Sequence, residues 1–206
     1  HPESVDHYGV KNAVHSWAAG ASGGVAKRRF VLMSSVGVQR RDGFPYSVLN
    51  GGGVLDAKAS GEAALLALAE ERGFATAIVR PGQLFGGPYE NNRYLGTLFQ
   101  LDKEVDTKSV SLVPGDTAVG DTLRSSLAGV LVRCLFAEAP RLEFAAVSEK
   151  GAAPTEEDVD EMISRLGSAP DGDVDEQAGK RLDLGLKTAQ EALKNLASGK
   201  VFGQSD

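Results

Sequence analysis

The sequence predicts an α/β protein in which a parallel sheet is covered by helices on both faces. The first observation is that short continuous apolar runs, typical of strands buried on both faces, alternate with longer helical segments. The second is that Gly, Pro or Ser residues follow each apolar run and interrupt the pattern before the next helix. This alternation is typical of βαβ units, which place a parallel sheet between two layers of helices.

Composition restricts the class of protein further. A chain of 206 residues is long enough for one domain, or for one domain with an appendage. Hydrophobic residues make up 42% and charged residues 24%, which is the composition of a folded globular protein. No apolar run approaches the roughly 18 residues that a membrane-spanning helix requires, so we expect no transmembrane segment. The single cysteine excludes a disulfide framework and an all-cysteine metal site.

The charged residues divide the chain into two parts. The net charge is −6, and residues 1–148 contain 15 basic and 15 acidic residues, whereas residues 149–206 contain 7 and 13. The second part therefore carries the whole excess of negative charge. We expect a domain over residues 1–153 and an acidic helical extension over residues 154–206.

The pattern of charge and histidine also excludes some partners. The basic residues form no stripe, which argues against a nucleic acid, because neutralising phosphates needs clustered Lys and Arg. Lys27-Arg28-Arg29 and Arg40-Arg41 are short runs that we expect at the solvated edge of loops. His7 and His15 are about two helical turns apart, too far to bind one metal ion together. No further pair of a histidine and a carboxylate completes a set of zinc ligands. We therefore expect no metal site.

A helix, two loops and a strand are predicted for the first quarter of the chain. Residues 3–18 carry apolar side chains at helical spacing, and Ser4 is placed to cap the first turn. Gly20–Gly24 interrupt this pattern as a loop. The apolar run 30–33 predicts a buried strand, and residues 39–53, which contain proline and a glycine cluster, are typical of a loop.

The strongest helix signal lies between residues 54 and 72, which are rich in Ala, Leu and Glu. Gly73 follows at the position where a helix commonly ends in a left-handed residue. Residues 74–79 then predict a second buried strand, which we expect to end where Pro81 cannot continue the ladder. Three more elements complete the domain: a strand at 110–113, a helix at 123–137 and a strand at 142–147.

Two helices are expected in the extension. Thr155 is a suitable N-cap for residues 155–166, and Glu156-Glu157-Asp158 fill the first turn, where they are expected to form a solvated acidic face rather than a catalytic carboxylate pair. A linker rich in Gly and Asp, residues 169–179, leads to a second helix at 183–198. Apolar residues form a stripe along this expected helix and just before it: Leu182, Leu184, Leu186, Ala189, Leu193 and Leu196. Two interpretations stay open, packing back on the domain or docking on another protein through residues 155–206.

Candidate functional residues follow the strands directly. In parallel sheets, ligands bind beyond the carboxyl ends of the strands. Ser34-Ser35, Arg80-Pro81-Gly82 and Pro114-Gly115-Asp116 occupy these positions. Cys134, by contrast, lies in an apolar run without a histidine partner, so we expect it to be buried and without a catalytic role.

Several segments, in this order, resemble the short-chain dehydrogenase/reductase superfamily, in particular its atypical NmrA-like branch. They are residues 5–12 (VDHYGVKN), 29–35 (RFVLMSS), 58–62 (KASGE), 78–82 (IVRPG) and 120–126 (GDTLRSS). The resemblance covers about residues 3–150. It implies a Rossmann-like doubly wound parallel sheet that binds NADP or NAD.

The resemblance also implies roles for single residues. Ser35 matches the family's catalytic serine, and Lys58 matches the lysine that binds the cofactor ribose. The family's catalytic tyrosine lies four residues before this lysine, on the same helical face, where this chain has Val54. Tyr46 is the nearest upstream tyrosine, in an expected loop. Asn12 matches an asparagine that organises the first helix.

The backbone of one strand end also belongs to the implied cofactor site. The full set of implied cofactor-binding residues is Ser34, Ser35, Lys58, Arg80, Pro81 and Gly82. A glycine-rich turn between a strand and a helix, which would hold the pyrophosphate, is missing, because Gly20–Gly24 follow a helix and precede a strand. The chain also begins with His1. We therefore expect the amino-terminal strands of the fold to be absent from this sequence.

Three functions remain open at this point. The resemblance and the valine at position 54 favour a non-catalytic or weakly catalytic NAD(P)-binding-fold protein, a subunit or assembly factor of a larger complex. The alternative is an NAD(P)H-dependent oxidoreductase of the atypical branch, and a third possibility is a redox sensor. The continuation RPGQLFGGPY, residues 80–89, looks most like that of proteins from photosynthetic organisms, so we expect a chloroplast location, with the cytoplasm as the alternative.

Overall fold

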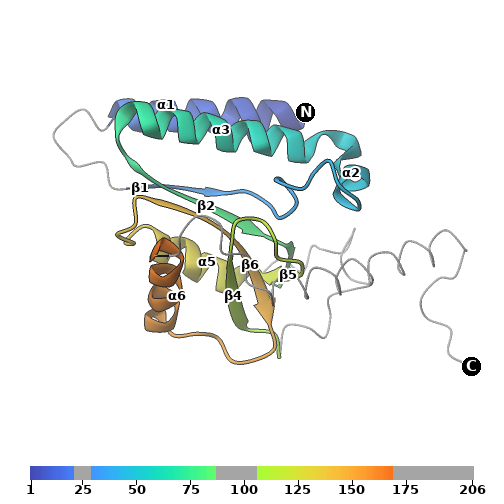
Figure 1. The fold of residues 1–206 in the computed structure, drawn as a ribbon, viewed down its shortest axis with the longest axis vertical. Coiled ribbons are helices and arrows are strands. Elements are labelled where there is room, and N and C mark those ends of the chain that lie inside the picture. The colour runs from blue at the N-terminus through green and yellow to red at the C-terminus, as the bar shows by residue number, and fades with distance from the viewer. Residues whose placement is uncertain (21–28, 87–105, 169–206) are drawn as a thin grey trace, which may run out of the picture.

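A four-stranded sheet organises the molecule (Figure 1). The computed structural model describes residues 1–20, 29–86 and 106–168. The sheet contains β1 (Arg29–Met33), β2 (Ala75–Pro81), β6 (Arg141–Glu149) and β4 (Ser109–Pro114), hydrogen-bonded in that order. β1, β2 and β6 are parallel, which confirms the expected α/β class. β2 extends through Pro81, which pairs with Ala146, so the expected end before this proline was wrong.

The edge strand β4 departs from the expected all-parallel sheet, because it runs antiparallel to β6. The reason is where the chain enters the sheet. Thr107, just before β4, bridges Gly151, which lies just past the carboxyl end of β6. The chain therefore enters at the carboxyl edge and runs back along β6, which gives a mixed sheet of a kind common among α/β folds.

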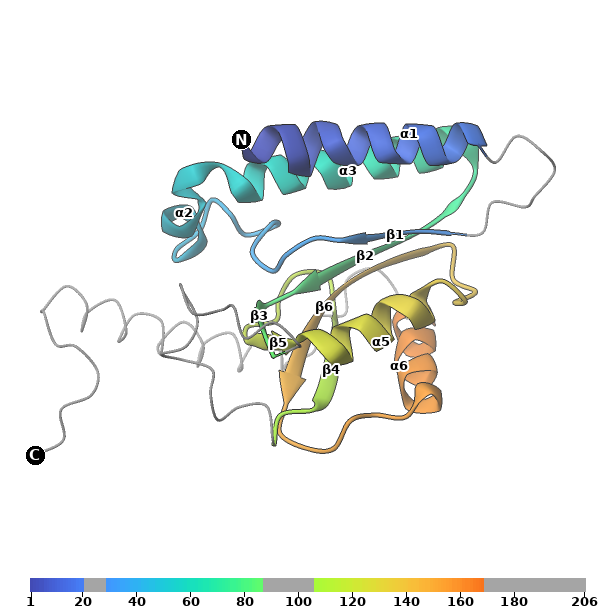
Figure 2. The same ribbon diagram turned by 180° about the vertical axis from the view of Figure 1, so that it is seen from behind.

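A second, two-stranded parallel sheet was not predicted. It joins β3 (Gln83–Phe85) to β5 (Asp121–Leu123) beside the carboxyl end of the main sheet (Figure 2). Both strands are three residues long, too short to show a hydrophobic period. Thr122 links the two sheets, because its buried hydroxyl donates to the carbonyl of Ala146 in β6 (2.6 Å).

One face of the sheet is covered by two helical rods that lie side by side (Figures 1 and 2). The first comprises η1 (Glu3–Gly9) and α1 (Val10–Gly20), and the second is α3 (Val54–Arg72). They pack on β1 and β2 through a buried apolar cluster: Val14, Ala18, Leu65, Leu68, Ala69, Phe74 and Ile78.

The first rod confirms the predicted helix but corrects its start. The expected cap at Ser4 is wrong: η1 begins after Pro2, has π-helical turns and has no side-chain cap. α3 has the predicted bounds, and Gly73 ends it with φ of 69°. Within the predicted loop 39–53, a short helix α2 (Tyr46–Leu49) and a 3₁₀ turn (Asn50–Gly52) form instead of irregular structure alone.

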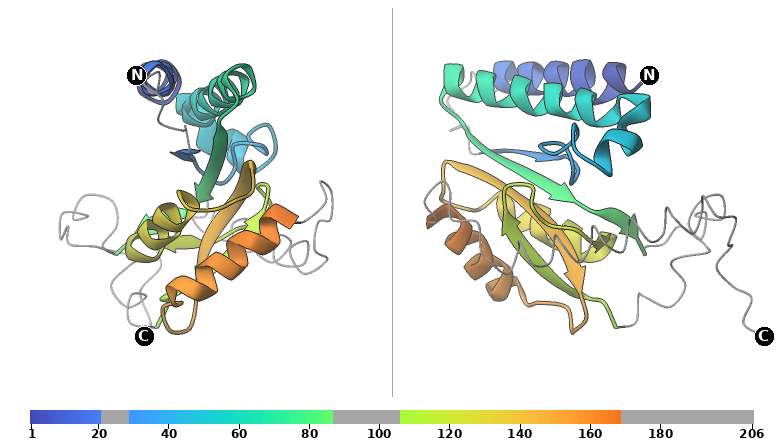
Figure 3. Two further views of the ribbon diagram at one scale, coloured as in Figure 1. Left: turned by 90° about the vertical axis from the view of Figure 1, so that its left-hand side faces the viewer. Right: turned by 45° about the vertical axis from the view of Figure 1, so that its right-hand side comes forward.

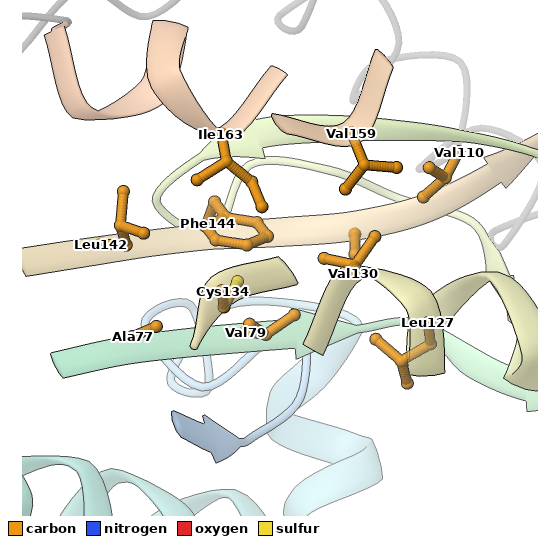
Figure 4. Packing of buried hydrophobic residues seen from close by; sticks show 11 residues of the cluster. Ala77, Val79, Val110, Leu127, Val130, Cys134, Leu142, Phe144, Val159 and Ile163 are labelled. Atoms are coloured by element: carbon orange, nitrogen blue, oxygen red, sulfur yellow. The ribbon is translucent and has the colours of Figure 1, made fainter. Parts of the chain in front are cut away.

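The opposite face is covered by α5 (Arg124–Cys134) and α6 (Glu156–Ser168) (Figure 3). The core lies between them and the sheet, where Phe144 of β6 is surrounded by Val130 and Cys134 from α5 and Val159 and Ile163 from α6 (Figure 4). These five residues are buried.

Two details of this layer test the predictions made for α5 and α6. α5 ends three residues before the predicted limit of 137, because residues 135–137 turn back on the last carbonyls of the helix. α6 begins as predicted, with Thr155 and Asp158 each accepting a hydrogen bond from the other's backbone N–H. Glu156, Glu157 and Asp158 are exposed, as expected of a solvated acidic face.

The expected division at residues 153 and 154 stays a prediction. The packing of Val159 and Ile163 shows, however, that the first helix of the extension shares the core of the domain. The predicted linker 169–179, the helix at 183–198 and most of the loop 20–24 lie outside the described residues. Among the described helices, none has the length and apolar character needed to cross a bilayer.

Candidate functional site

The carboxyl ends of β1 and β2 bring two predicted segments together. The backbone N–H of Ser34 donates to the carbonyl of Val79 (2.8 Å), and that of Val36 donates to the carbonyl of Pro81 (2.9 Å). The parallel pairing therefore continues past the end of β1. As a result, Ser34-Ser35 lies beside Arg80-Pro81, as expected for residues that end neighbouring parallel strands.

The two serines differ in their surroundings. Ser34 is 5% exposed, and its hydroxyl has no hydrogen-bond partner among the residues that the structure describes. Ser35 is half-buried, and its hydroxyl donates only to the adjacent carbonyl of Val36 (3.1 Å). A buried hydroxyl without a partner costs free energy, so Ser34 is an unsatisfied group at this edge.

Arg80 serves the interior of the fold. Its side chain has no exposure, and its guanidinium donates to both carboxylate oxygens of Glu62 (3.0 and 2.7 Å) and to Glu143 (2.8 Å). Burial acts to lower the pKa of Arg80, but the hydrogen bonds and charges of the two glutamates outweigh it and raise that pKa. A third acceptor is the carbonyl of Gly115 (3.3 Å). The side chain of Arg80 therefore binds partners inside the protein, and only the backbone of this residue can face a ligand.

Gly82 is the point of closest approach between the two sheets. Its backbone N–H donates to the hydroxyl of Thr122 (2.8 Å). A Cβ at this position would lie 1.8 Å from the carbonyl oxygen of Gly120, a backbone atom that cannot move aside. Gly82 therefore brings the segment before β5 against the end of β2, and its N–H already has a partner.

Lys58 lies on α3, one turn after Val54. Its ammonium forms an ion pair with Asp6 of η1 (2.8 Å), and both side chains are about one-fifth exposed. Val54, the first residue of α3, is 39% exposed and brings no hydroxyl to this face. Asn12 lies on the exposed side of α1. The predicted lysine is thus present but held by a carboxylate of its own chain.

A buried polar cluster joins the loop after β1 to the turn after β4. The carboxylate of Asp116, 1% exposed, accepts hydrogen bonds from the backbone N–H groups of Gly37 and Gln39 (both 2.8 Å) and from Arg40 (3.3 Å). Arg40 also donates to the carbonyl of Ala118 (2.8 Å). The expectation that Arg40 lies at a solvated loop edge was wrong, because it neutralises a buried carboxylate.

Tyr46 belongs to the same cluster. Arg40 donates to its hydroxyl (3.2 Å), and the guanidinium lies 4.7 Å from the ring centroid. Burial is the largest cause of a raised pKa for this phenol, and the carboxylate of Asp116 adds to it against the charge of Arg40. The phenol therefore keeps its proton at neutral pH.

Sequence reasoning found part of this edge and missed the rest. Asp116 was singled out, because it follows a strand. Arg40, which binds Asp116, and Tyr46, which Arg40 contacts, carry no local signal, since Arg40 reaches Asp116 only when two loops far apart in sequence meet. Arg29 is a similar case, because it is 5% exposed and donates to the carbonyls of Thr76 (2.8 Å) and Ala137 (2.9 Å) instead of lying at a loop edge.

The edge offers hydroxyl groups and hydrogen-bond donors rather than a metal site. Ser34, Ser35 and Tyr46 supply hydroxyls, and Arg40 supplies a cation that is one-fifth exposed. Within the described ranges, no three His, Cys, Asp or Glu side chains lie close enough to hold a metal ion. Such an edge suits a neutral or anionic polar ligand.

Comparisons with known proteins bear on the fold. No protein-family model matches the chain, and no curated protein matches it. A solved structure described as an NAD-dependent epimerase/dehydratase of Bacillus halodurans is 18% identical, with a TM-score of 0.53. An oxidoreductase of Lactococcus lactis is 17% identical, with a TM-score of 0.50. Each match covers 79% of this chain and 60% of the solved chain, so the sequence spans about three-fifths of these structures. The chain therefore has a Rossmann-like α/β fold.

Proposed function

We propose that this chain is part of a nicotinamide-nucleotide-dependent oxidoreductase of the atypical short-chain dehydrogenase/reductase branch. The observation that carries the proposal is the meeting of Ser34-Ser35 with Arg80-Pro81-Gly82 at the carboxyl edge of a parallel sheet. Ligands of such sheets bind at this edge. The two structural neighbours, described as NAD-dependent and as an oxidoreductase, support the same class.

The described residues fit one half of a dinucleotide. The unsatisfied hydroxyl of Ser34, the weakly held hydroxyl of Ser35 and the partly exposed ammonium of Lys58 suit a ribose and a carboxamide. None of the described residues forms a glycine-rich turn between a strand and a helix that could hold pyrophosphate. The nicotinamide and its ribose are thus the part of the ligand that the described residues would contact.

Each residue then has a definite task. The nicotinamide, when bound, would supply or accept hydride. Ser35 would turn its hydroxyl from the carbonyl of Val36 towards the reacting oxygen of the substrate. Lys58 would exchange the carboxylate of Asp6 for the ribose hydroxyls. Because Val54 gives no proton donor, proton transfer would be slower by about 10²–10⁴-fold than with a placed acid.

The second candidate is a non-catalytic subunit or assembly factor of a larger complex. The specific observation in its favour is that Val54 lacks a hydroxyl while Lys58 is already paired with Asp6. Protein partners would then bind through residues 155–206, and a chloroplast would be the compartment. This candidate predicts nucleotide binding without turnover, or no nucleotide binding at all.

Titration of the intact protein with NADPH and NADH, followed by calorimetry, tests the proposal. We expect binding by the wild type and at least tenfold weaker binding by Lys58→Ala, because the ribose loses a cationic donor. Lys11→Ala, on the exposed side of α1, is the matched control and should bind normally.

Turnover then separates the two candidates. The wild type is tested for oxidation of the reduced nucleotide with carbonyl and quinone substrates. Oxidation at a rate that Ser35→Ala lowers at least tenfold supports the oxidoreductase. Binding without oxidation of the nucleotide favours the non-catalytic subunit. Absence of nucleotide binding by the intact wild type would show that the proposal is wrong.

A further inference from the structure

The outward face of α5 and of the turn that follows it is apolar where a surface helix normally carries charge. Val132, Leu135 and Phe136 are 52%, 44% and 62% exposed. Together with small uncharged neighbours they form the α5 stripe, which repeats at helical spacing and carries no charged residue: Ser125, Ala128, Gly129, Val132, Leu135 and Phe136. An exposed apolar face of this kind indicates a surface that another segment covers.

The α5 stripe lies beside the seam between α5 and α6, and the seam is hollowed on both sides of Arg133. One hollow of about 430 Å³ is lined by Gly129, Val132 and Val159, among others. The other, of about 520 Å³, is lined by Phe136, Ile163 and neighbouring residues. Both hollows border acidic side chains, because Arg133 is paired with Glu156 and Asp160 of α6. The surface is thus apolar in the middle and acidic along α6.

We propose that residues 182–196 of the same chain cover the α5 stripe as an amphipathic helix. Their apolar residues recur at alternating intervals of four and three: Leu182, Leu186, Ala189, Leu193 and Leu196. This spacing gives one narrow apolar stripe along a helix and suits packing against a single neighbouring helix. The proposal does not depend on nucleotide binding or on catalysis.

The chain leaves α6 next to the α5 stripe. A Cβ at Gly167 would lie 2.6 Å from the Cβ of Ala139, so the end of α6 lies against the segment that follows Phe136. Residues 169–181 then provide a linker with an average end-to-end reach of roughly 20 Å if flexible. The α5 stripe itself is about 16 Å long, at 1.5 Å per residue. Residues 182–196 can therefore lie on it without strain.

Charge complementarity favours this occupant. Residues 180–200 contain five basic side chains and two acidic ones. α6, which borders the α5 stripe, contains five acidic side chains and one basic one. Although the extension is acidic as a whole, residues 182–196 are themselves neutral, with two basic and two acidic side chains, and the basic excess comes from Lys180, Arg181 and Lys200 on either side of them. The helix beside the docking surface is acidic, so these flanking basic side chains are the ones that complement it.

Tethering favours the same chain over a second copy. A short flexible linker holds a segment at an effective concentration on the order of millimolar. A second copy at micromolar concentration cannot compete unless the linker prevents docking within the chain. The reach of residues 169–181 allows residues 182–196 to dock on the α5 stripe of the same chain.

Thiol labelling of the full chain tests the proposal. The reporter is Val132→Cys, and the reference is Glu157→Cys on the exposed face of α6. Native Cys134 is buried, and the background labelling at this residue is measured on the protein without an added cysteine. We expect maleimide to label V132C at least tenfold more slowly than E157C. Leu186→Asp with Leu193→Asp should restore the rate at position 132, whereas Thr188→Asp with Gln190→Asp, off the stripe, should not.

The outcomes separate the possible occupants. Equal labelling of V132C and E157C in the wild-type background would overturn the proposal. Protection that disappears on dilution would assign the α5 stripe to a second copy and also overturn it. Should V132C fail to fold, judged by circular dichroism, Leu135→Cys replaces it as the reporter on the same stripe.

Discussion

At the scale of single residues, the charged side chains at the sheet edge stabilise the fold, because groups of the protein itself bind them and few of their atoms can bind a ligand. Arg80 satisfies Glu62, Glu143 and a carbonyl without any exposure. Asp116 fixes the loop after β1 through two backbone N–H groups. A buried charge is tolerated only when such partners surround it. The hydroxyls of Ser34 and Ser35 are therefore the freer groups at this edge.

Val54 allows a gain-of-function prediction. If the proposed oxidoreductase lacks only its proton donor, Val54→Tyr should raise kcat by about 10²-fold, because a placed general acid contributes on this scale. The side chain is 39% exposed, so a larger ring can be accommodated. Steady-state oxidation of NADPH measures the effect. Val54→Phe, which adds the ring without the hydroxyl, should leave kcat unchanged, and an equal gain in both variants would contradict the explanation.

Cys134 predicts a dependence of stability on alkaline pH. Burial, only partly opposed by the charge of Arg29, raises the pKa of its thiol from 9.0 to about 12. The folded state therefore favours the neutral thiol, and this contribution is complete below pH 9 and decreases as pH rises from 9 to 12. At pH 10.5 the loss is about 2 kcal/mol.

Urea unfolding at pH 8 and pH 10.5 measures this loss. Cys134→Ala should lose correspondingly less stability than the wild type between the two pH values. In the native protein at pH 8, a thiol reagent should not react with Cys134 until urea unfolds the chain. Rapid labelling of the native protein would show that the thiol is accessible.

At the scale of elements, close backbone contact holds the two rods on the first face together. A Cβ at Gly61 of α3 would lie 2.2 Å from the carbonyl oxygen of Asp6 in η1. The same contact brings Asp6 within reach of Lys58. Glycine at position 61 thus determines how closely η1 and α3 approach.

Gly61→Ala should destabilise the protein by about 1–3 kcal/mol, because the new methyl group displaces η1. Urea unfolding measures the change. Gly129→Ala is the matched control: it also replaces a glycine inside a helix, but no atom of the described residues lies within 4 Å of the Cβ that it would add. That variant should be stabilised by up to about 1 kcal/mol through helix propensity. Destabilisation of both variants to the same extent would contradict the steric explanation.

Elements with a long, regular pattern were predicted well, and short ones were not. α3 and the strands β1, β2, β4 and β6 show apolar runs or helical spacing that a reader of the sequence can recognise. β3 and β5 depend on Gly82 and Thr122, which bring together segments some forty residues apart. Because the contact between Gly82 and Thr122 joins distant segments, no sequence pattern within either strand predicts it.

At the scale of the whole molecule, one core joins the sheet to both helices of the second face. Ile163 of α6 is 3% exposed and packs in the cluster that contains Phe144 and Val130. The acidic helix α6 therefore contributes to the same core as the strands, although its charge differs from that of the preceding chain. Its cooperative unfolding with the sheet can be tested.

Ile163→Ala should destabilise the protein by about 2–5 kcal/mol, because it leaves a cavity beside Phe144. Glu157→Ala, exposed on the same helix, should change stability by less than about 0.5 kcal/mol. Denaturant unfolding followed by circular dichroism and by intrinsic fluorescence measures both. A separate early transition of α6, with the sheet unaffected by Ile163→Ala, would show that the extension is an independent unit.

The sequence by itself determined the α/β class, the order of the longer strands and helices, and the serines and glycines that follow the strands. These depend on hydrophobic period and on turn residues, which are local in the chain. Only the tertiary structure decided that β4 runs antiparallel and that Lys58 is paired with Asp6. It also decided that Arg40 binds both Asp116 and Tyr46. These features depend on contacts between distant segments, whose geometry is fixed by packing and by the need to neutralise buried charge.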